Sequence, residues 1–121
     1  MTFIYDFILL LVRMGYAAAT PFNAKAKAFT TGRKNFFRNL KKQIGTPAGS
    51  IVWMHCASLG EFEQGRPLIE KLKQEFPSHK ILLTFFSPSG YEVRKNYEHA
   101  DYIVYLPWDT HKHAVRLIEM V

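Results

Sequence analysis

The pattern of apolar and polar positions divides the chain into two parts that meet near residues 45–50. In the second part, short apolar runs alternate with segments whose apolar residues recur at helical spacing. The runs predict strands at Ile51–His55, Lys80–Phe86 and Tyr102–Leu106, and the spacing predicts helices at about Gly60–Phe76, Ser89–Tyr97 and Thr110–Met120. This alternation is typical of an α/β fold with a parallel sheet covered by helices.

Two details of this α/β part have more than one interpretation. Right-handed crossovers place the first strand beside the second, and the third strand either beyond the second or on the other side of the first. Pro67 falls inside the helix predicted from Gly60, where it removes a backbone donor. Either the helix is loosened at Pro67, or a loop continues and the regular helix begins at Pro67 itself.

The most apolar stretch of the chain runs from Phe3 to Ala19. About 20 predominantly apolar residues are needed to span a bilayer, and this stretch is shorter and contains the charged residues Asp6 and Arg13. We therefore predict a helix that dips into one leaflet or spans marginally, with Arg13 reaching the headgroups. A buried helix is the alternative. A cleaved signal peptide fits less well, because no basic residues precede the apolar run.

A second helical stretch, from Ala24 to Ile44, combines basic and aromatic residues. Its apolar positions Phe29, Phe36, Phe37 and Leu40 share one helical face, and Thr30-Thr31-Gly32 is a possible interruption. It contains no acidic residue and seven basic ones, Lys25, Lys27, Arg33, Lys34, Arg38, Lys41 and Lys42. A basic helix with an aromatic face suits an anionic membrane surface, whereas an ordinary solvated helix is the alternative. No nucleic-acid partner is expected, because the segment follows an apolar stretch and shows no binding motif.

The turn-rich segment Gly45–Ser50 predicts a boundary between an anchor and connector, residues 1–44, and a globular domain, residues 51–121. From Gln43 onward there are eight basic and nine acidic residues, so the excess positive charge belongs to the first part. The single Cys56 excludes an intramolecular disulfide and a cysteine-only metal site. The histidines lack metal-site spacing and there is no dinucleotide fingerprint, so neither a metal nor a cofactor is predicted.

The candidate chemistry is concentrated in residues 55–61, which follow the first predicted strand with the sequence His-Cys-Ala-Ser-Leu-Gly-Glu. Open parallel sheets bind ligands at the carboxyl ends of their strands, where this loop is expected. The spacing of Ser58 and Glu61 fits a capping box, in which both side chains bond free amides at a helix start. Alternatively, Glu61 is a carboxylate in a cleft that accepts a proton from a hydroxyl group. Cys56 has no neighbouring base, so a covalent mechanism is not proposed.

Two later loops repeat the arrangement of a strand followed by a polar turn. Ser87-Pro88-Ser89-Gly90 follows the second predicted strand, and Ser89 either caps the next helix or contacts an anionic ligand there. Leu106-Pro107-Trp108-Asp109 follows the third predicted strand. Asp109 is predicted to cap the last helix, and Trp108 either lines a cleft or packs in the core.

These motifs resemble those of the Kdo transferases, which add 3-deoxy-D-manno-octulosonic acid (Kdo) to lipid A precursors. Residues 55–61 match the family signature H-x-x-S-[VIL]-G-E. Residues 87–90 match its [ST]-P-[ST]-G loop, and residues 106–109 match its L-P-[WY]-D loop. With the apolar start and the basic connector, the resemblance extends over the whole chain, and the three motifs together are far more specific than any one alone.

The resemblance implies a Rossmann-like acceptor-binding half of a two-domain GT-B glycosyltransferase at the cytoplasmic face of the inner membrane. It implies Glu61 as the general base, CMP-Kdo as the donor and a lipid A precursor as the acceptor. The implied substrate-binding residues are Ser58, Gly60, Ser87, Ser89 and Gly90. The donor-binding domain is missing from this sequence, so we expect no catalysis by this chain alone. Two alternatives remain: a transferase half for another membrane-bound sugar acceptor, and a non-enzymatic membrane-surface module.

Overall fold

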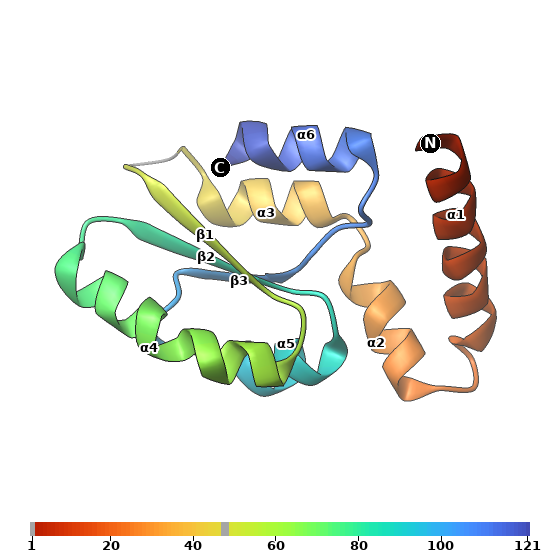
Figure 1. The fold of residues 1–121 in the computed structure, drawn as a ribbon, viewed down its shortest axis with the longest axis horizontal. Coiled ribbons are helices and arrows are strands. Elements are labelled where there is room, and N and C mark those ends of the chain that lie inside the picture. The colour runs from red at the N-terminus through yellow and green to blue at the C-terminus, as the bar shows by residue number, and fades with distance from the viewer. Residues whose placement is uncertain (1, 47–48) are drawn as a thin grey trace.

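The computed structural model describes residues 2–46 and 49–121, which form an α/β fold around a three-stranded parallel sheet (Figure 1). The sheet has the order β1-β2-β3, so the third strand lies beyond the second. The helices are α1 (Thr2–Ala19), α2 (Ala24–Gly32), α3 (Phe36–Ile44), α4 (Leu59–Glu75), α5 (Pro88–Arg94) and α6 (His111–Met120). The strands are β1 (Ile51–Cys56), β2 (Lys80–Phe85) and β3 (Tyr102–Tyr105). The predicted α/β class with a parallel sheet is confirmed.

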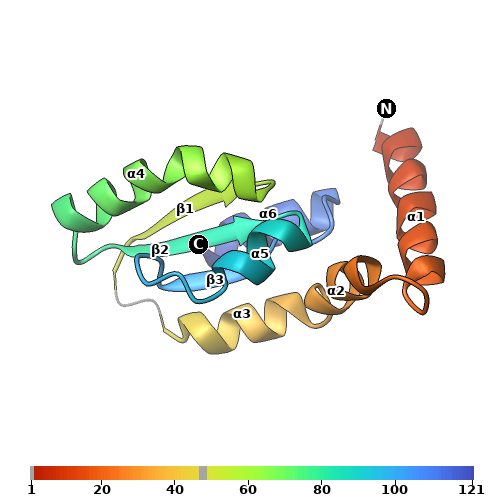
Figure 2. The same cartoon turned by 90° about the horizontal axis from the view of Figure 1, so that it is seen from below.

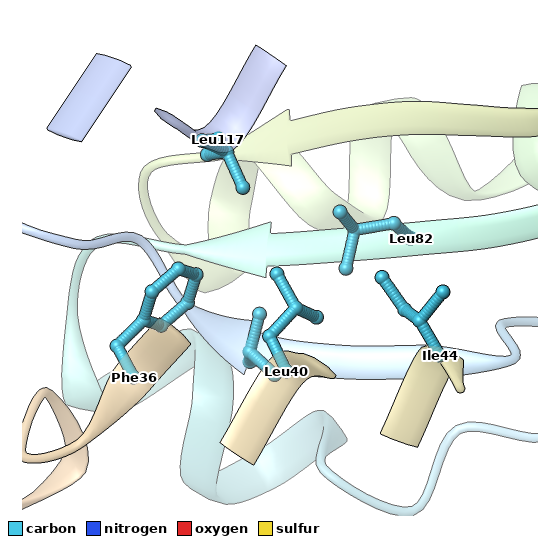
Figure 3. Close-up of a cluster of buried hydrophobic side chains, with 6 residues drawn as sticks. Phe36, Leu40, Ile44, Leu82 and Leu117 are labelled. Carbon is cyan, nitrogen blue, oxygen red and sulfur yellow. The ribbon is translucent and has the colours of Figure 1, made fainter. Parts of the chain in front are cut away.

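Helices cover both faces of the sheet, with α3 and α6 on one side and α4 and α5 on the other (Figures 1 and 2). Alternation along β2 supplies both cores, because successive side chains of a strand point to opposite faces. The first core consists of Phe36, Leu40, Ile44, Leu82, Val104 and Leu117 (Figure 3). The second core consists of Cys56, Phe62, Ile69, Ile81, Leu83 and Phe85. β2 is therefore the central strand, and its residues from Ile81 to Phe85 are all buried.

The basic stretch after α1 is broken into two helices. α2 ends at Gly32, and Asn35 adopts a left-handed conformation with φ of 55° just before α3 begins. The apolar face that was predicted to meet a membrane is instead buried inside the protein, because Phe36 and Leu40 pack against the sheet. α3 thus shares a core with residues 51–121, whereas the division into domains at residues 45–50 stays a prediction.

α1 stands at the side of the molecule and packs against α2 (Figures 1 and 2). Most of its large apolar side chains are exposed, and Phe3 has an exposed fraction of 89%. The remaining exposed apolar residues of α1 are Ile4, Tyr5, Phe7, Ile8, Leu10, Leu11, Val12 and Met14. Within residues 2–46 and 49–121, no helix combines the length and the apolar character that crossing a membrane requires.

α4 is continuous through Pro67, so the interpretation in which a helix begins at Pro67 is wrong. Ser58 caps α4, and the buried side chains Phe62 and Ile69 lie two turns apart on the face that packs against the sheet. The capping bond and the packing of these side chains hold the helix on both sides of Pro67. The proline therefore removes one backbone donor but does not end the helix.

Candidate functional site

The loops that follow the three strands meet at the carboxyl edge of the sheet. The amide of Ser87 in the second loop donates to the carbonyl of Ala57 in the first loop at 2.9 Å. The amide of Leu106, at the start of the third loop, donates to the carbonyl of Phe85 at 2.7 Å. The predicted site residues of the first two loops are therefore held at one edge by backbone hydrogen bonds.

Glu61 takes part in the predicted capping arrangement. The Ser58 hydroxyl accepts a hydrogen bond from the Glu61 amide at 3.4 Å, and Glu61 Oε2 accepts one from the Ala57 amide at 2.7 Å. The side chain nevertheless remains exposed. Among the described residues, the hydrogen bonds to the carboxylate engage Oε2 only. The arrangement therefore combines a cap with an oriented carboxylate whose second oxygen accepts no hydrogen bond from the residues that the structure describes.

The two candidate glycines meet different steric constraints. A Cβ atom on Gly90 would overlap the ring of Phe85 and come within 3.2 Å of the Ser58 carbonyl carbon, so this glycine allows α5 to approach the first loop. A Cβ atom on Gly60 would meet only Ser58 Oγ, at 3.8 Å. Glycine inside a helix costs about 1 kcal/mol relative to alanine. Packing alone would therefore allow alanine at position 60. The glycine leaves open space beside Glu61.

The helix caps in the second and third loops differ from the predicted ones. α5 begins at Pro88 after Ser87, so Ser89 lies inside the helix and is not its cap. Proline is favoured at the first helical position, which explains why the helix begins there. The hydroxyls of Ser87 and Ser89 are 2.8 Å apart and bond each other.

Thr110, and not Asp109, caps α6. The Thr110 hydroxyl accepts a hydrogen bond from the His113 amide at 3.3 Å. Asp109 instead accepts one from the hydroxyl of Tyr5 in α1 at 2.6 Å. The third loop is thereby connected to the exposed N-terminal helix, a relationship between distant segments that local spacing does not reveal.

His55 and Trp53 lie on the α6 side of β1 and share one partner. Trp53 Nε1 donates to Thr84 Oγ1 at 2.9 Å, and His55 Nδ1 is 3.0 Å from the same oxygen. Partial desolvation lowers the pKa of His55, although the hydrogen bond with Thr84 and the nearby charge of Glu61 act in the opposite direction. Both side chains line a cavity of about 250 Å³, together with Leu106, Pro107, Trp108, Asp109, Ala114 and Leu117.

Cys56 points into the core on the other face of the sheet. Burial, and secondarily the charge of Glu61, raises the pKa of its thiol, which disfavours the thiolate that a nucleophile requires. Within the described parts of the chain, no group of three or more His, Cys, Asp or Glu side chains is placed to hold a metal ion.

Arg33 is a buried residue of this edge that sequence analysis missed. Its Nη1 donates to the carbonyl of Phe29 at 2.9 Å, and its Nη2 donates to the carbonyl of Phe86 in the second loop at 2.6 Å. The guanidinium lies 3.6 Å from the centre of the Phe29 ring. Burial lowers the pKa of Arg33 to about 10, so the side chain remains charged at neutral pH. In the sequence it resembles the other residues of a basic run, and only the preceding Thr-Thr-Gly hints at its separate position.

The family described as "3-Deoxy-D-manno-octulosonic-acid transferase (kdotransferase)" has a sequence profile that matches residues 23–121. The chain belongs to the Kdo transferase family. The match includes α2, α3 and all three loops of the site, so the family assignment and the observed geometry refer to the same part of the molecule.

Curated relatives carry the same transferase name. The 3-deoxy-D-manno-octulosonic acid transferase of Aquifex aeolicus is 42% identical over 62 residues, which are 51% of this chain and 16% of that protein. The Haemophilus influenzae enzyme is 34% identical over 76 residues, which are 62% of this chain and 18% of that protein. The chain thus matches less than a fifth of the length of either relative. No solved structure matches it significantly.

Proposed function

We propose that this chain is the acceptor-binding part of an enzyme that transfers Kdo from CMP-Kdo to a lipid A precursor. Membership in the Kdo transferase family is the observation that carries the proposal. The three-stranded parallel sheet is the start of a Rossmann-like half of a GT-B glycosyltransferase, and a separate domain binds the donor. The parallel pairing and the strand order β1-β2-β3 fit that arrangement.

Glu61 is the proposed general base. It accepts the proton of an acceptor hydroxyl while the hydroxyl oxygen bonds to the anomeric carbon of Kdo. The bond from that carbon to the CMP phosphate breaks, and CMP leaves with the bonding electrons. A positioned base contributes roughly 10²–10⁴-fold to the rate. The hydrogen bond from the Ala57 amide fixes the orientation of the carboxylate, which supports this role.

The substrate contacts are proposed at the same edge. Ser58 and Gly60 border Glu61, and Ser87, Ser89 and Gly90 belong to the adjoining loop. The open space at Gly60 supports close approach by the acceptor. The paired hydroxyls of Ser87 and Ser89 offer both donors and acceptors to a sugar. Gly90 serves the site indirectly, by allowing the second loop to pack against the first.

The proposed location is the cytoplasmic face of the inner membrane, with α1 as the membrane-contacting element. Its exposed apolar side chains are the supporting observation, because an apolar patch of this kind on a protein surface marks a partner or a lipid phase. Contacts of Tyr5 with Asp109 and of Tyr16 with Phe29 connect α1 to the carboxyl edge of the sheet. An acceptor embedded in the membrane is thus brought to the edge that presents Glu61.

A graft tests the proposal. Residues 23–121 replace the matching segment of the Haemophilus influenzae enzyme, and transfer of radiolabelled Kdo from CMP-Kdo to a lipid A precursor is measured. We expect transfer well above that of a graft in which the segment is deleted. A folded graft without transfer to this acceptor would contradict the proposed function.

A further inference from the structure

We infer that a cavity between α3, α6 and the third loop is a binding site for a phosphomonoester. The cavity has a volume of about 310 Å³ and lies beside the apolar cavity at His55, with which it shares Pro107 and Trp108. Its other lining residues are Arg33, Asn35, Phe36, Phe37, Arg38, His113 and Arg116. Its described lining contains three arginines and no acidic residue, so its electrostatic preference is for an anion.

No ion pair within the described part of the chain neutralises the arginines of this cavity. Among the described residues, Arg66 and Arg94 form ion pairs with carboxylates, whereas Arg33, Arg38 and Arg116 form none. Arg33 has an exposed fraction of only 7%, its guanidinium lies over the Phe29 ring, and its Nε has no hydrogen-bond partner among the described residues. A buried charge without an ionic partner is costly, and a nearby anion reduces that cost.

The start of α3 adds to the same preference. Asn35 lies at the N-cap position in a left-handed conformation, and its side chain makes no capping hydrogen bond. The first amides of α3 are therefore not capped by a side chain, and Asn35, Phe36, Phe37 and Arg38 all line the cavity. Uncapped amides and the partial positive charge of a helix start bind phosphate groups well. The helix start and the arginines act on the same space.

Aromatic contacts hold the outer groups of the cavity in place. The Arg116 guanidinium lies 4.3 Å from the centre of the Phe37 ring, and the Phe37 and His113 rings are 5.4 Å apart. His113 Nδ1 donates to the carbonyl of Trp108 at 2.9 Å, since a carbonyl only accepts. A planar guanidinium held against a ring loses little freedom when it binds phosphate, and two of its N–H groups match two phosphate oxygens.

The volume and the walls specify the class of phosphate. Ligand cavities for small molecules begin at about 300 Å³, so this one accommodates more than an inorganic phosphate. Phe37, Pro107 and Trp108 provide apolar surface next to the arginines. A phosphate with one carbon substituent, such as a sugar phosphate or a lipid phosphomonoester, fits this combination. That the phosphate belongs to the sugar acceptor rests on the proposed function, whereas phosphate binding itself does not.

Binding is tested on the 121-residue chain in detergent micelles. Glucose 1-phosphate is titrated while backbone amide NMR signals are followed, with glucose as the phosphate-free control. We expect saturable shifts concentrated on residues 35–38 and 113–116. Arg38→Gln and Arg116→Gln each weaken binding about tenfold, because each removes charge-assisted hydrogen bonds from a site that solvent still reaches. Both side chains are exposed, so these variants keep the fold, which circular dichroism verifies.

Lys42→Gln is the matched control, since it removes one positive charge from the same helix outside the cavity lining. We expect it to change the affinity less than twofold. Equal weakening by Lys42→Gln, or no saturable binding by the wild type, would overturn the site. The experiment contains no donor substrate, so its failure is distinct from failure of the proposed transfer reaction.

A second experiment, with vesicles, decides whether the cavity binds a lipid phosphate or a soluble sugar phosphate. Binding of the wild-type chain, Arg116→Gln and Lys42→Gln is measured on phosphatidylcholine vesicles with and without phosphatidic acid, whose headgroup is a phosphomonoester. If phosphatidic acid increases vesicle binding of the wild type and of Lys42→Gln but not of Arg116→Gln, the cavity binds a lipid phosphate. If phosphatidic acid increases vesicle binding of all three proteins equally, and the wild type binds glucose 1-phosphate tightly, the cavity binds a soluble sugar phosphate. The inference would be contradicted if Arg116→Gln and Lys42→Gln had equal effects on both glucose 1-phosphate binding and vesicle binding.

Discussion

Glu61 Oε2 accepts a hydrogen bond from the amide of Ala57 at 2.7 Å, and this contact joins a helix cap to a proposed catalytic group. Two substitutions of Glu61 distinguish its role as a cap from its proposed role as a base. Glu61→Gln retains an oxygen that accepts the same bond, whereas Glu61→Ala removes it. We expect Glu61→Ala to lower the free energy of unfolding by about 0.5–1 kcal/mol and Glu61→Gln to lower it less. Urea denaturation followed by tryptophan fluorescence measures both values, and equal losses would contradict the capping role.

The two glycines of the site are expected to respond in opposite directions to the same substitution. Gly90→Ala places a Cβ atom in steric overlap with Cδ1 of the Phe85 ring, so we expect a loss of about 1–3 kcal/mol in the free energy of unfolding. Gly60→Ala meets open space in a helix and is expected to stabilise the chain by about 0.5–1 kcal/mol. Thermal unfolding compares the two variants. A destabilised Gly60→Ala variant would show that the described packing around that residue is wrong.

The exposed apolar surface of α1 predicts attachment to membranes. Replacing Phe3, Phe7 and Leu11 with serine removes large exposed side chains from this helix, and we expect binding to phosphatidylcholine-phosphatidylglycerol vesicles to fall at least about tenfold. Substitution is a sharper test than removing residues 1–44, because removal also takes α3 from the core. Vesicle flotation measures the bound fraction. Unchanged flotation of the serine variant would refute the role of α1.

The ion pairs of Asp101 predict how stability depends on pH. Its carboxylate accepts hydrogen bonds from Lys73 Nζ at 2.7 Å, the Ile81 amide at 2.8 Å and Lys80 Nζ at 3.1 Å. Burial acts to raise the pKa of Asp101, but these partners hold it below its ordinary value. A depressed folded-state pKa adds stability above the unfolded-state value of about 3.9, and that stability is lost as the pH falls further.

We therefore expect Asp101→Asn to lower the free energy of unfolding by about 1–3 kcal/mol at pH 7 and by less at pH 3. Glu75→Gln is the control, because Glu75 forms an exposed pair with Lys71 at 3.6 Å, and such surface pairs contribute little to stability. Urea denaturation at both pH values measures the difference. A loss in Asp101→Asn that stays constant with pH would show that the carboxylate charge is not its cause.

The sequence predicted the parallel sheet well, because each apolar run and each helical spacing is a local signal. The strand predicted at Lys80–Phe86 is observed at Lys80–Phe85, and the helix predicted at Thr110–Met120 is observed at His111–Met120. The capping pair Ser58 and Glu61 was also predictable, since the two bonds span only a few residues. Local spacing indicated Ser89 as a possible cap of the next helix, but α5 begins at Pro88, so Ser87 holds the N-cap position and Ser89 lies inside the helix.

The contacts between distant segments could not be predicted from the pattern. Arg33 carries the same charge as its neighbours in the basic run, and only the folded chain places it against Phe86, 53 positions away. The aromatic face of α3 suits a membrane surface in the sequence, but it packs against the sheet, because amphipathic helices have the same pattern whether a sheet or a lipid covers them. The contact between Tyr5 and Asp109 likewise depends on how α1 is placed beside the third loop.

The central claim, that Glu61 is the base of a Kdo transfer reaction, is tested most directly by turnover of the grafted enzyme carrying Glu61→Gln. Glutamine preserves the cap and the size of the side chain but does not accept the proton. We predict turnover at least about 10²-fold below the unsubstituted graft, with nearly unchanged stability and acceptor affinity. Turnover equal to that of the unsubstituted graft would contradict the assignment of Glu61 as the base.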